Sequence, residues 1–230
     1  MTTNSLSTST QAGGVALADA PLADGPPDDP RMVFAKAVAL GTAVIGRVGP
    51  HQLANPTPCP DLDVRGLLDH LVTVLRRVAA LGRAADPFGP GVFAGVDGDR
   101  WHRAWLGAAH DVQAAWADDA SLARTVRLPW LVDTGAAALV VYVNEITVHT
   151  WDLATATGQR PAWDPEVLGV ALDGIRIMPA EGRSAIFEQV RANMPPGRDG
   201  FADPFADAVP VPADAPLIDR LVAWNGRRPC

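Results

Sequence analysis

The sequence is poor in lysine, tyrosine and cysteine, and it contains no long apolar run. Lys36 is the only lysine, and 19 basic residues face 26 acidic ones, giving a formal net charge of -7. A nucleic-acid-binding protein needs a basic surface, so this charge argues against a nucleic-acid partner. The longest apolar stretch, residues 136–143, is much shorter than the roughly 18 residues of a membrane span, so no membrane partner is expected.

Two cysteines, Cys59 and Cys230, are too few for a disulfide framework. We therefore expect a protein of the reducing cytoplasm. A length of 230 residues with 48% hydrophobic content suits one globular domain with an appendage. The composition excludes the class of disulfide-rich secreted proteins and the class of membrane proteins. We expect a monomer or homodimer that acts on a small molecule.

The first thirty residues have neither a basic nor an aromatic side chain. A secretory signal needs a positive start and a longer apolar stretch, and both are missing. Such a segment has little apolar surface to bury, so residues 1–30 are expected to form a disordered tail.

The remaining chain is predicted to be helical, because apolar residues recur with a period near 3.6 and no useful strand pattern appears. Asp63 is a suitable N-cap, and Gly158 a suitable stop, for two of the helices. The sequence predicts an all-α protein, with a helical bundle over residues 31–160 and a short, mostly helical extension over 161–230 packed on it. We expect bundle helices over residues 31–48, 64–82, 99–118 and 136–157, a short extended segment within 121–135, and extension helices over 165–178, 181–192 and 215–226.

The stretch "VNEITVHTWD" places Glu145, His149 and Asp152 at spacing i, i+4, i+7, which is one face of a helix. His70 lies beside the apolar stripe of an earlier helix. Each of these residues alone could lie on an ordinary polar surface, or in the core with its polar atoms hydrogen-bonded. Together His70, Glu145 and His149 form a candidate metal site, because bundle metal sites are built from inward side chains on facing helices.

Two histidines and one glutamate with an open position are typical of a catalytic divalent-metal site. The open position could hold a thiol, which a divalent cation deprotonates, or a water whose pKa falls to about 7. The ligand types do not distinguish these two possibilities.

Three segments carry a resemblance to a known family: "TPCPDLDVRGLLDHL" (57–71), "NEITVHTWDLATATGQ" (144–159) and "VPVPADAPLIDRLVAWNGRRP" (209–229). They resemble the DinB-like superfamily, in its actinobacterial branch related to mycothiol-dependent maleylpyruvate isomerase. The resemblance implies a four-helix bundle whose metal ligands are His70, Glu145 and His149. It also implies one divalent ion, zinc foremost or nickel, and mycothiol or a similar thiol as cosubstrate.

The isomerase has a full α/β C-terminal domain, whereas only residues 159–230 follow the matching motif here. Maleylpyruvate isomerisation itself is therefore not the expected reaction. The resemblance favours a transferase or isomerase in which metal-bound thiol attacks a small electrophile. A metal-dependent hydrolase or cyclase of a secondary pathway, and a non-catalytic small-molecule-binding bundle, remain alternatives.

Asp152 and Cys59 have two interpretations each. Asp152 could orient the second ring nitrogen of His149 or bond to loop backbone. Cys59 could be a small buried thiol or a ligand. Arg176 and Arg183 are basic residues of the extension that could reach an anionic substrate. No residue is singled out as a catalytic acid, base or substrate-binding group.

Overall fold

The computed structural model describes residues 29–96, 98–192, 194 and 205–229. Residues 1–28 of the expected tail lie outside this range, and Pro30 already belongs to the first helix. The elements are α1 (Pro30–Ile45), the short 3-10 helix η1 (Pro50–Gln52), α2 (Val64–Gly82), α3 (Trp101–Ala115), α4 (Asp119–Ala123), β1 (Thr125–Leu128), β2 (Leu131–Thr134), α5 (Gly135–Ala156), α6 (Pro165–Ile175), α7 (Arg183–Ala192) and α8 (Leu217–Trp224).

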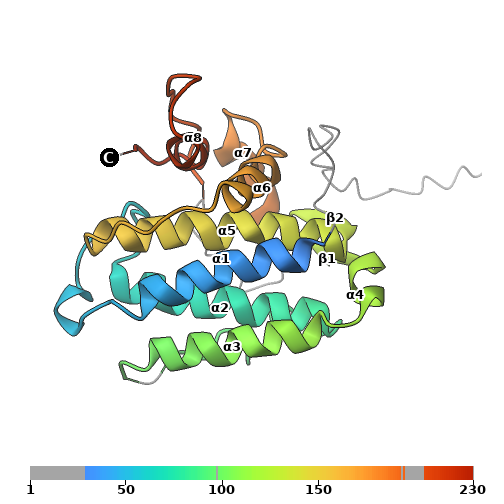
Figure 1. The fold of residues 1–230 in the computed structure, drawn as a ribbon. Helices are drawn as coiled ribbons and strands as arrows, with labels where there is room; N and C mark the ends of the chain where they lie inside the picture. Colours follow the sequence, from blue (N-terminus) through green and yellow to red (C-terminus); the bar gives the residue numbers. More distant parts are fainter. Residues whose placement is uncertain (1–28, 97, 193, 195–204, 230) are drawn as a thin grey trace, which may run out of the picture.

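Four long helices form the bundle, which confirms the predicted all-α class. Figure 1 shows α1, α2, α3 and α5 side by side with nearly parallel axes, and α6, α7 and α8 on the far side of α5. Helix α5 therefore contacts the bundle through α1 and α2 and the later helices through α6 and α8. Within the described residues, none of the helices has the length and apolar character required to cross a membrane.

Side-chain caps fix where the main helices begin. The carboxylate of Asp63 accepts a hydrogen bond from the Gly66 amide at 2.8 Å, which confirms Asp63 as the N-cap of α2. Thr134 caps α5 in the same way. Gly158 follows the end of α5 with a φ of +70°, a conformation that glycine adopts without strain.

The expected extended segment forms a small antiparallel hairpin of β1 and β2 between α4 and α5. Val126 and Leu128 alternate with exposed neighbours and are buried, as the two-residue period of a strand requires. Trp130 lies in the hairpin turn and Leu131 begins β2, which leads directly into α5.

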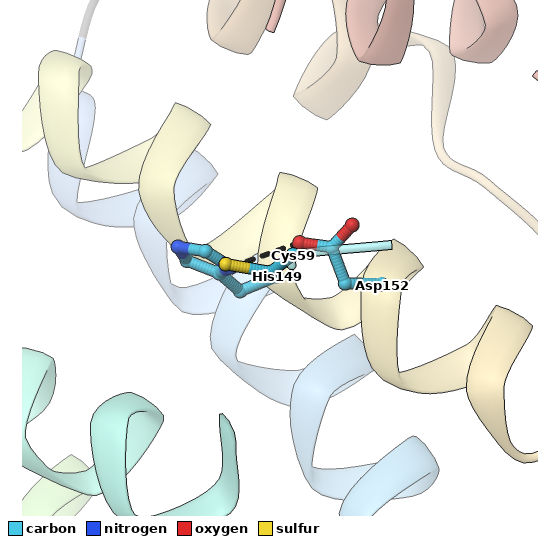
Figure 2. A group of neighbouring side chains, drawn as sticks. All are labelled: Cys59, His149 and Asp152. Atoms are coloured by element: carbon cyan, nitrogen blue, oxygen red, sulfur yellow. Dashed lines mark hydrogen bonds and ion pairs between the residues drawn. The ribbon is translucent and has the colours of Figure 1, made fainter. Parts of the chain in front are cut away.

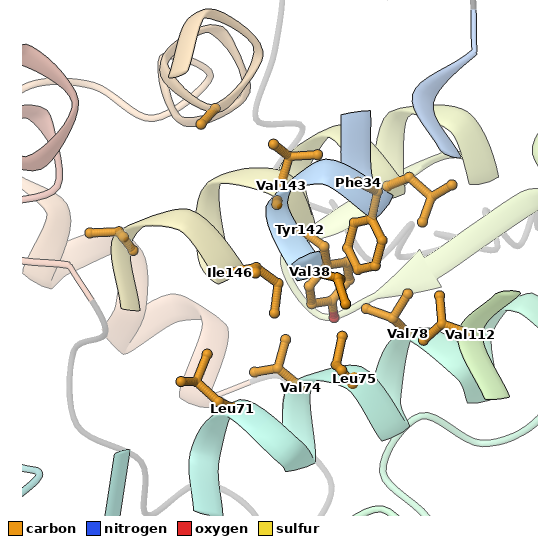
Figure 3. Packing of buried hydrophobic residues seen from close by; sticks show 14 of the residues in the cluster. Phe34, Val38, Leu71, Val74, Leu75, Val78, Val112, Tyr142, Val143 and Ile146 are labelled. Atoms are coloured by element: carbon orange, nitrogen blue, oxygen red, sulfur yellow. The ribbon is translucent and has the colours of Figure 1, made fainter. Parts of the chain in front are cut away.

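The core lies between α1, α2, α3 and α5. Figure 3 shows Leu75 and Val78 of α2 pointing towards Tyr142 of α5 and Phe34 of α1. Helix α6 also approaches α5 closely at Gly174, where a Cβ atom would lie 2.9 Å from the Val140 carbonyl oxygen. This close contact joins the extension to the bundle.

A buried amide pair ties the extension to α5. Asn144 and Asn225 exchange two side-chain hydrogen bonds, at 3.1 and 2.8 Å, and both residues are almost fully buried. Asn225 follows α8, so this pair fixes the end of α8 against the middle of α5.

Arg183 does not reach a substrate site, contrary to one expectation. Its guanidinium is fully buried and donates to the backbone carbonyls of Pro179, Ala206 and Trp224. Arg176 lies over the indole of Trp224, with its guanidinium carbon 5.7 Å from the ring centre. Both arginines therefore stabilise the extension itself.

We expect Asn225→Ala to lower the free energy of unfolding by about 2 kcal/mol, because the buried amide of Asn144 loses its partner. Urea denaturation followed by circular dichroism measures the change. Asp214→Ala, at an exposed position, serves as control and is expected to change stability by less than about 0.5 kcal/mol. Equal stability of the two variants would show that the amide pair contributes nothing.

Candidate metal centre

Helices α2 and α5 bring the three predicted ligands together. His70 Nε2 lies 3.0 Å from Glu145 Oε1, and His149 Nε2 lies 3.6 Å from the same oxygen. One donor atom of each residue lies within 4.8 Å of the other two. The i, i+4 spacing in α5 presents Glu145 and His149 on one face, and α2 supplies His70 opposite them.

Burial differs across the three side chains. His149 and Glu145 expose 3% and 15% of their side chains, whereas His70 exposes 31%. The two imidazole rings meet edge to face with centres 4.7 Å apart. The site is therefore closed on the α5 side and accessible beside His70.

Opposing effects set the protonation of the site. Burial would raise the pKa of Glu145, but the charge and hydrogen bond of His149, with the hydrogen bond of His70, hold this pKa well below its usual range. Burial would lower the pKa of His149, yet Glu145 and Asp152 raise it to about 9. Burial lowers the pKa of His70. Near neutral pH, Glu145 is thus ionised, His149 protonated and His70 neutral.

Asp152 holds the second nitrogen of His149. Its Oδ2 lies 3.0 Å from His149 Nδ1 and also accepts a hydrogen bond from Arg227 at 2.9 Å. Burial would raise the pKa of Asp152, but the bond from His149 and the charge of Arg227 lower it. An ionised Asp152 holds a proton on Nδ1 of His149, so the proton that His149 loses when it binds an ion is the one on Nε2, which faces Glu145.

Cys59 joins His149 and Asp152 in a second group of close donor atoms. Figure 2 shows the Cys59 sulfur beside the His149 ring and the Asp152 carboxylate. Burial raises the pKa of the Cys59 thiol to about 11, so it stays protonated at neutral pH. Asp152 is already paired with Arg227. This second group is therefore a poorer metal site than the first.

The donor set of His70, Glu145 and His149 fits a divalent ion. It combines one carboxylate oxygen with two imidazole nitrogens, the donor types that zinc and nickel share. The Asp152 bond to Nδ1 is the arrangement that raises the basicity of a ligating histidine. These three residues would hold the ion, and Asp152 would orient His149.

The triad opens into a cavity of about 800 Å³ between the bundle and the extension. Its walls are mainly apolar, and they come from α2, α5, the 88–93 loop, the hairpin turn, α6 and α7. The lining includes Cys59, His70, Thr73, Arg77, Phe88, Phe93, Trp130, Leu131, Tyr142, Glu145, His149, Ile175, Met178, Ile186, Phe187, Val190 and Phe205.

Sequence reasoning missed two polar residues of this cavity, Arg77 and Tyr142, and one residue behind the site, Arg227. Arg77 follows His70 by seven residues, and Tyr142 precedes His149 by seven. Two turns of helix separate each pair, so helical spacing could have placed Arg77 on the same face as His70 and Tyr142 on the same face as His149. No local pattern joins Arg227 to Asp152, because 75 residues separate them.

Residues 34–154, which include all three members of the triad, match the family model described as the mycothiol maleylpyruvate isomerase N-terminal domain. Two uncharacterized proteins of Mycobacterium tuberculosis, from strains CDC 1551 / Oshkosh and ATCC 25618 / H37Rv, are each 33% identical over 201 residues. These matches cover 86% of this chain and 98% of each relative. No solved structure matches it significantly. The chain thus belongs to the mycothiol maleylpyruvate isomerase N-terminal domain family.

Proposed function

We propose that the protein is a divalent-metal-dependent enzyme that uses a low-molecular-weight thiol of the mycothiol type to attack a small electrophile, as a transferase or isomerase. One observation carries the proposal: Glu145 lies between two imidazoles where the triad opens into a large, mainly apolar cavity. The mycothiol association of the family supports the choice of thiol.

A divalent ion at the triad would supply the positive charge that keeps a thiol ionised near neutral pH, where the free thiol is mostly protonated. The chain's own residues prepare the site for it. His149 is held in one tautomer by Asp152, and Glu145 balances part of the positive charge. Cys59 is not the nucleophile, because its high pKa keeps it protonated.

The mainly apolar walls favour an organic electrophile over a polar metabolite, because desolvating an apolar group is favourable and desolvating a polar one costs free energy. They also limit the access of water, which would otherwise compete with the thiol. The proposal places the protein in the reducing cytoplasm, where such thiols are found, as a monomer or homodimer without a nucleic-acid or membrane partner.

Purified protein is expected to hold about one divalent ion per chain. His70→Ala and His149→Ala should each lose most of it, since each removes one of three ligands. Elemental analysis of the purified variants measures the metal content. His110→Ala, at an exposed position of α3, should keep the metal and serves as the control. Full occupancy in both triad variants would exclude the triad as the site.

Metal affinity is expected to rise with pH. His149 has a pKa of about 9 in the metal-free site and must lose its Nε2 proton to become a ligand. Each pH unit below about 9 should therefore weaken binding about tenfold, until other groups also titrate. Competition with a chelator of known affinity, repeated from about pH 6.5 to pH 8.5, measures the slope. An affinity independent of pH would contradict the assigned protonation.

The choice of thiol over water is tested with cobalt-substituted protein. Adding mycothiol or a close mimic near neutral pH should produce a sulfur-to-cobalt charge-transfer band. Glu145→Gln should weaken this response strongly, and Asp152→Asn less, since Asp152 acts only through the orientation of His149. Turnover of a substrate without any thiol, and with no spectral response to thiols, would favour the hydrolase or cyclase alternative.

A further inference from the structure

The cavity has a second polar end, remote from the triad. His70 and Arg77 lie seven residues apart on α2, and Tyr142 and His149 lie seven apart on α5. His70 meets His149 and Arg77 interacts with Tyr142, so the two helices run in opposite directions here. Seven residues of helix span about 10 Å, which is the distance along the cavity between its two polar ends.

One polar atom of each residue at this second end has no hydrogen-bond partner among the described residues. Within the described part of the chain, the Nε atom of Arg77 and the hydroxyl of Tyr142 are buried without a hydrogen-bond partner. Tyr142 is 4% exposed, so its hydroxyl is cut off from bulk solvent. Buried polar groups are almost always hydrogen-bonded, and two unsatisfied donors lining one cavity indicate an acceptor that enters with a ligand.

The charge of Arg77 is also not neutralised by the protein. Among the described residues, no carboxylate forms an ion pair with it, and three aromatic rings surround the guanidinium instead. Its central carbon lies 5.4 Å from the ring centre of Phe88, 5.7 Å from that of Phe93 and 6.0 Å from that of Trp130. These rings hold the guanidinium in place through cation–π contacts and leave its charge available.

The chemistry at this end suits a carboxylate. A guanidinium presents a planar fork of donors that matches two carboxylate oxygens, and a phenol adds a third donor. The cavity that holds both ends is lined mainly by apolar side chains, among them Ile175, Met178 and Phe187. A ligand that satisfies both ends is therefore an elongated apolar molecule with one anionic terminus.

We propose that Arg77 and Tyr142 bind the carboxylate of an elongated, mostly apolar acid, whose reactive carbon lies about 10 Å away at the triad. The second half of this statement rests on the proposed function, because it takes the triad as the reaction centre. The carboxylate subsite rests on the contacts of Arg77 and Tyr142 and does not depend on the triad. If the triad is the reaction centre, the electrophile is an apolar carboxylic acid.

Binding of decanoate, compared with the uncharged decanol, tests the subsite by isothermal titration calorimetry below micelle-forming concentrations. The metal-loaded protein should bind decanoate at least about tenfold more tightly than decanol. Arg77→Met should weaken decanoate binding about tenfold, and Tyr142→Phe about threefold, with little effect on decanol. Arg76→Met is the matched control, since Arg76 donates to the Ala94 carbonyl and does not line the cavity.

Two further measurements separate this proposal from the metal site. Chelator-treated protein and His149→Ala should retain the preference for decanoate, whatever metal the triad holds. Loss of decanoate binding on chelation, with no effect of Arg77→Met beyond that of Arg76→Met, would place the carboxylate at the triad and overturn the subsite. Equal affinity for decanoate and decanol would also overturn it.

Circular dichroism checks that each variant folds. If Arg77→Met does not fold, Arg77→Lys replaces it, because lysine keeps the charge but loses the planar fork. Its expected loss of decanoate affinity is about threefold. An unchanged affinity in both Arg77→Lys and Tyr142→Phe would overturn the subsite.

Discussion

A chain of alternating buried charges runs from Glu145 through His149 and Asp152 to Arg227, and the fold has to keep all four together. An isolated ion in the interior costs several kcal/mol, and removing one partner of a buried pair leaves such an ion behind. Here two carboxylates alternate with two cations, so the metal-free site is close to neutral. The position of α5 against the segment after α8 is therefore electrostatically constrained as well as packed.

This constraint makes the extension part of the site. Arg227 returns to α5 from beyond α8, Asn225 pairs with Asn144, and α6 and α7 form one wall of the cavity. The family model covers only the bundle, residues 34–154. The helices that follow the matched range form the wall that faces the triad.

Much of the fold and the triad could be predicted from the sequence, because both depend on local spacing. The helical period, the Asp63 cap and the Glu145–His149 spacing are short-range patterns. The contact of Asp152 with His149 follows from their spacing, but its contact with Arg227 and the partners of Arg183 and the two asparagines could not be predicted, since they join segments far apart in the chain without a repeating pattern. The near absence of lysine is consistent with these roles, because an arginine can donate to several acceptors at once where a lysine presents a point charge.

The distance between Asp152 and Arg227 along the chain also sets an order of assembly. Seventy-five residues separate them, which a ribosome takes roughly 4 to 15 s to translate. Throughout that interval the bundle sequence is synthesised but the arginine is not, so Asp152 has only His149 as a cationic partner. The Asp152 carboxylate gains its second cation only after translation has passed Arg227.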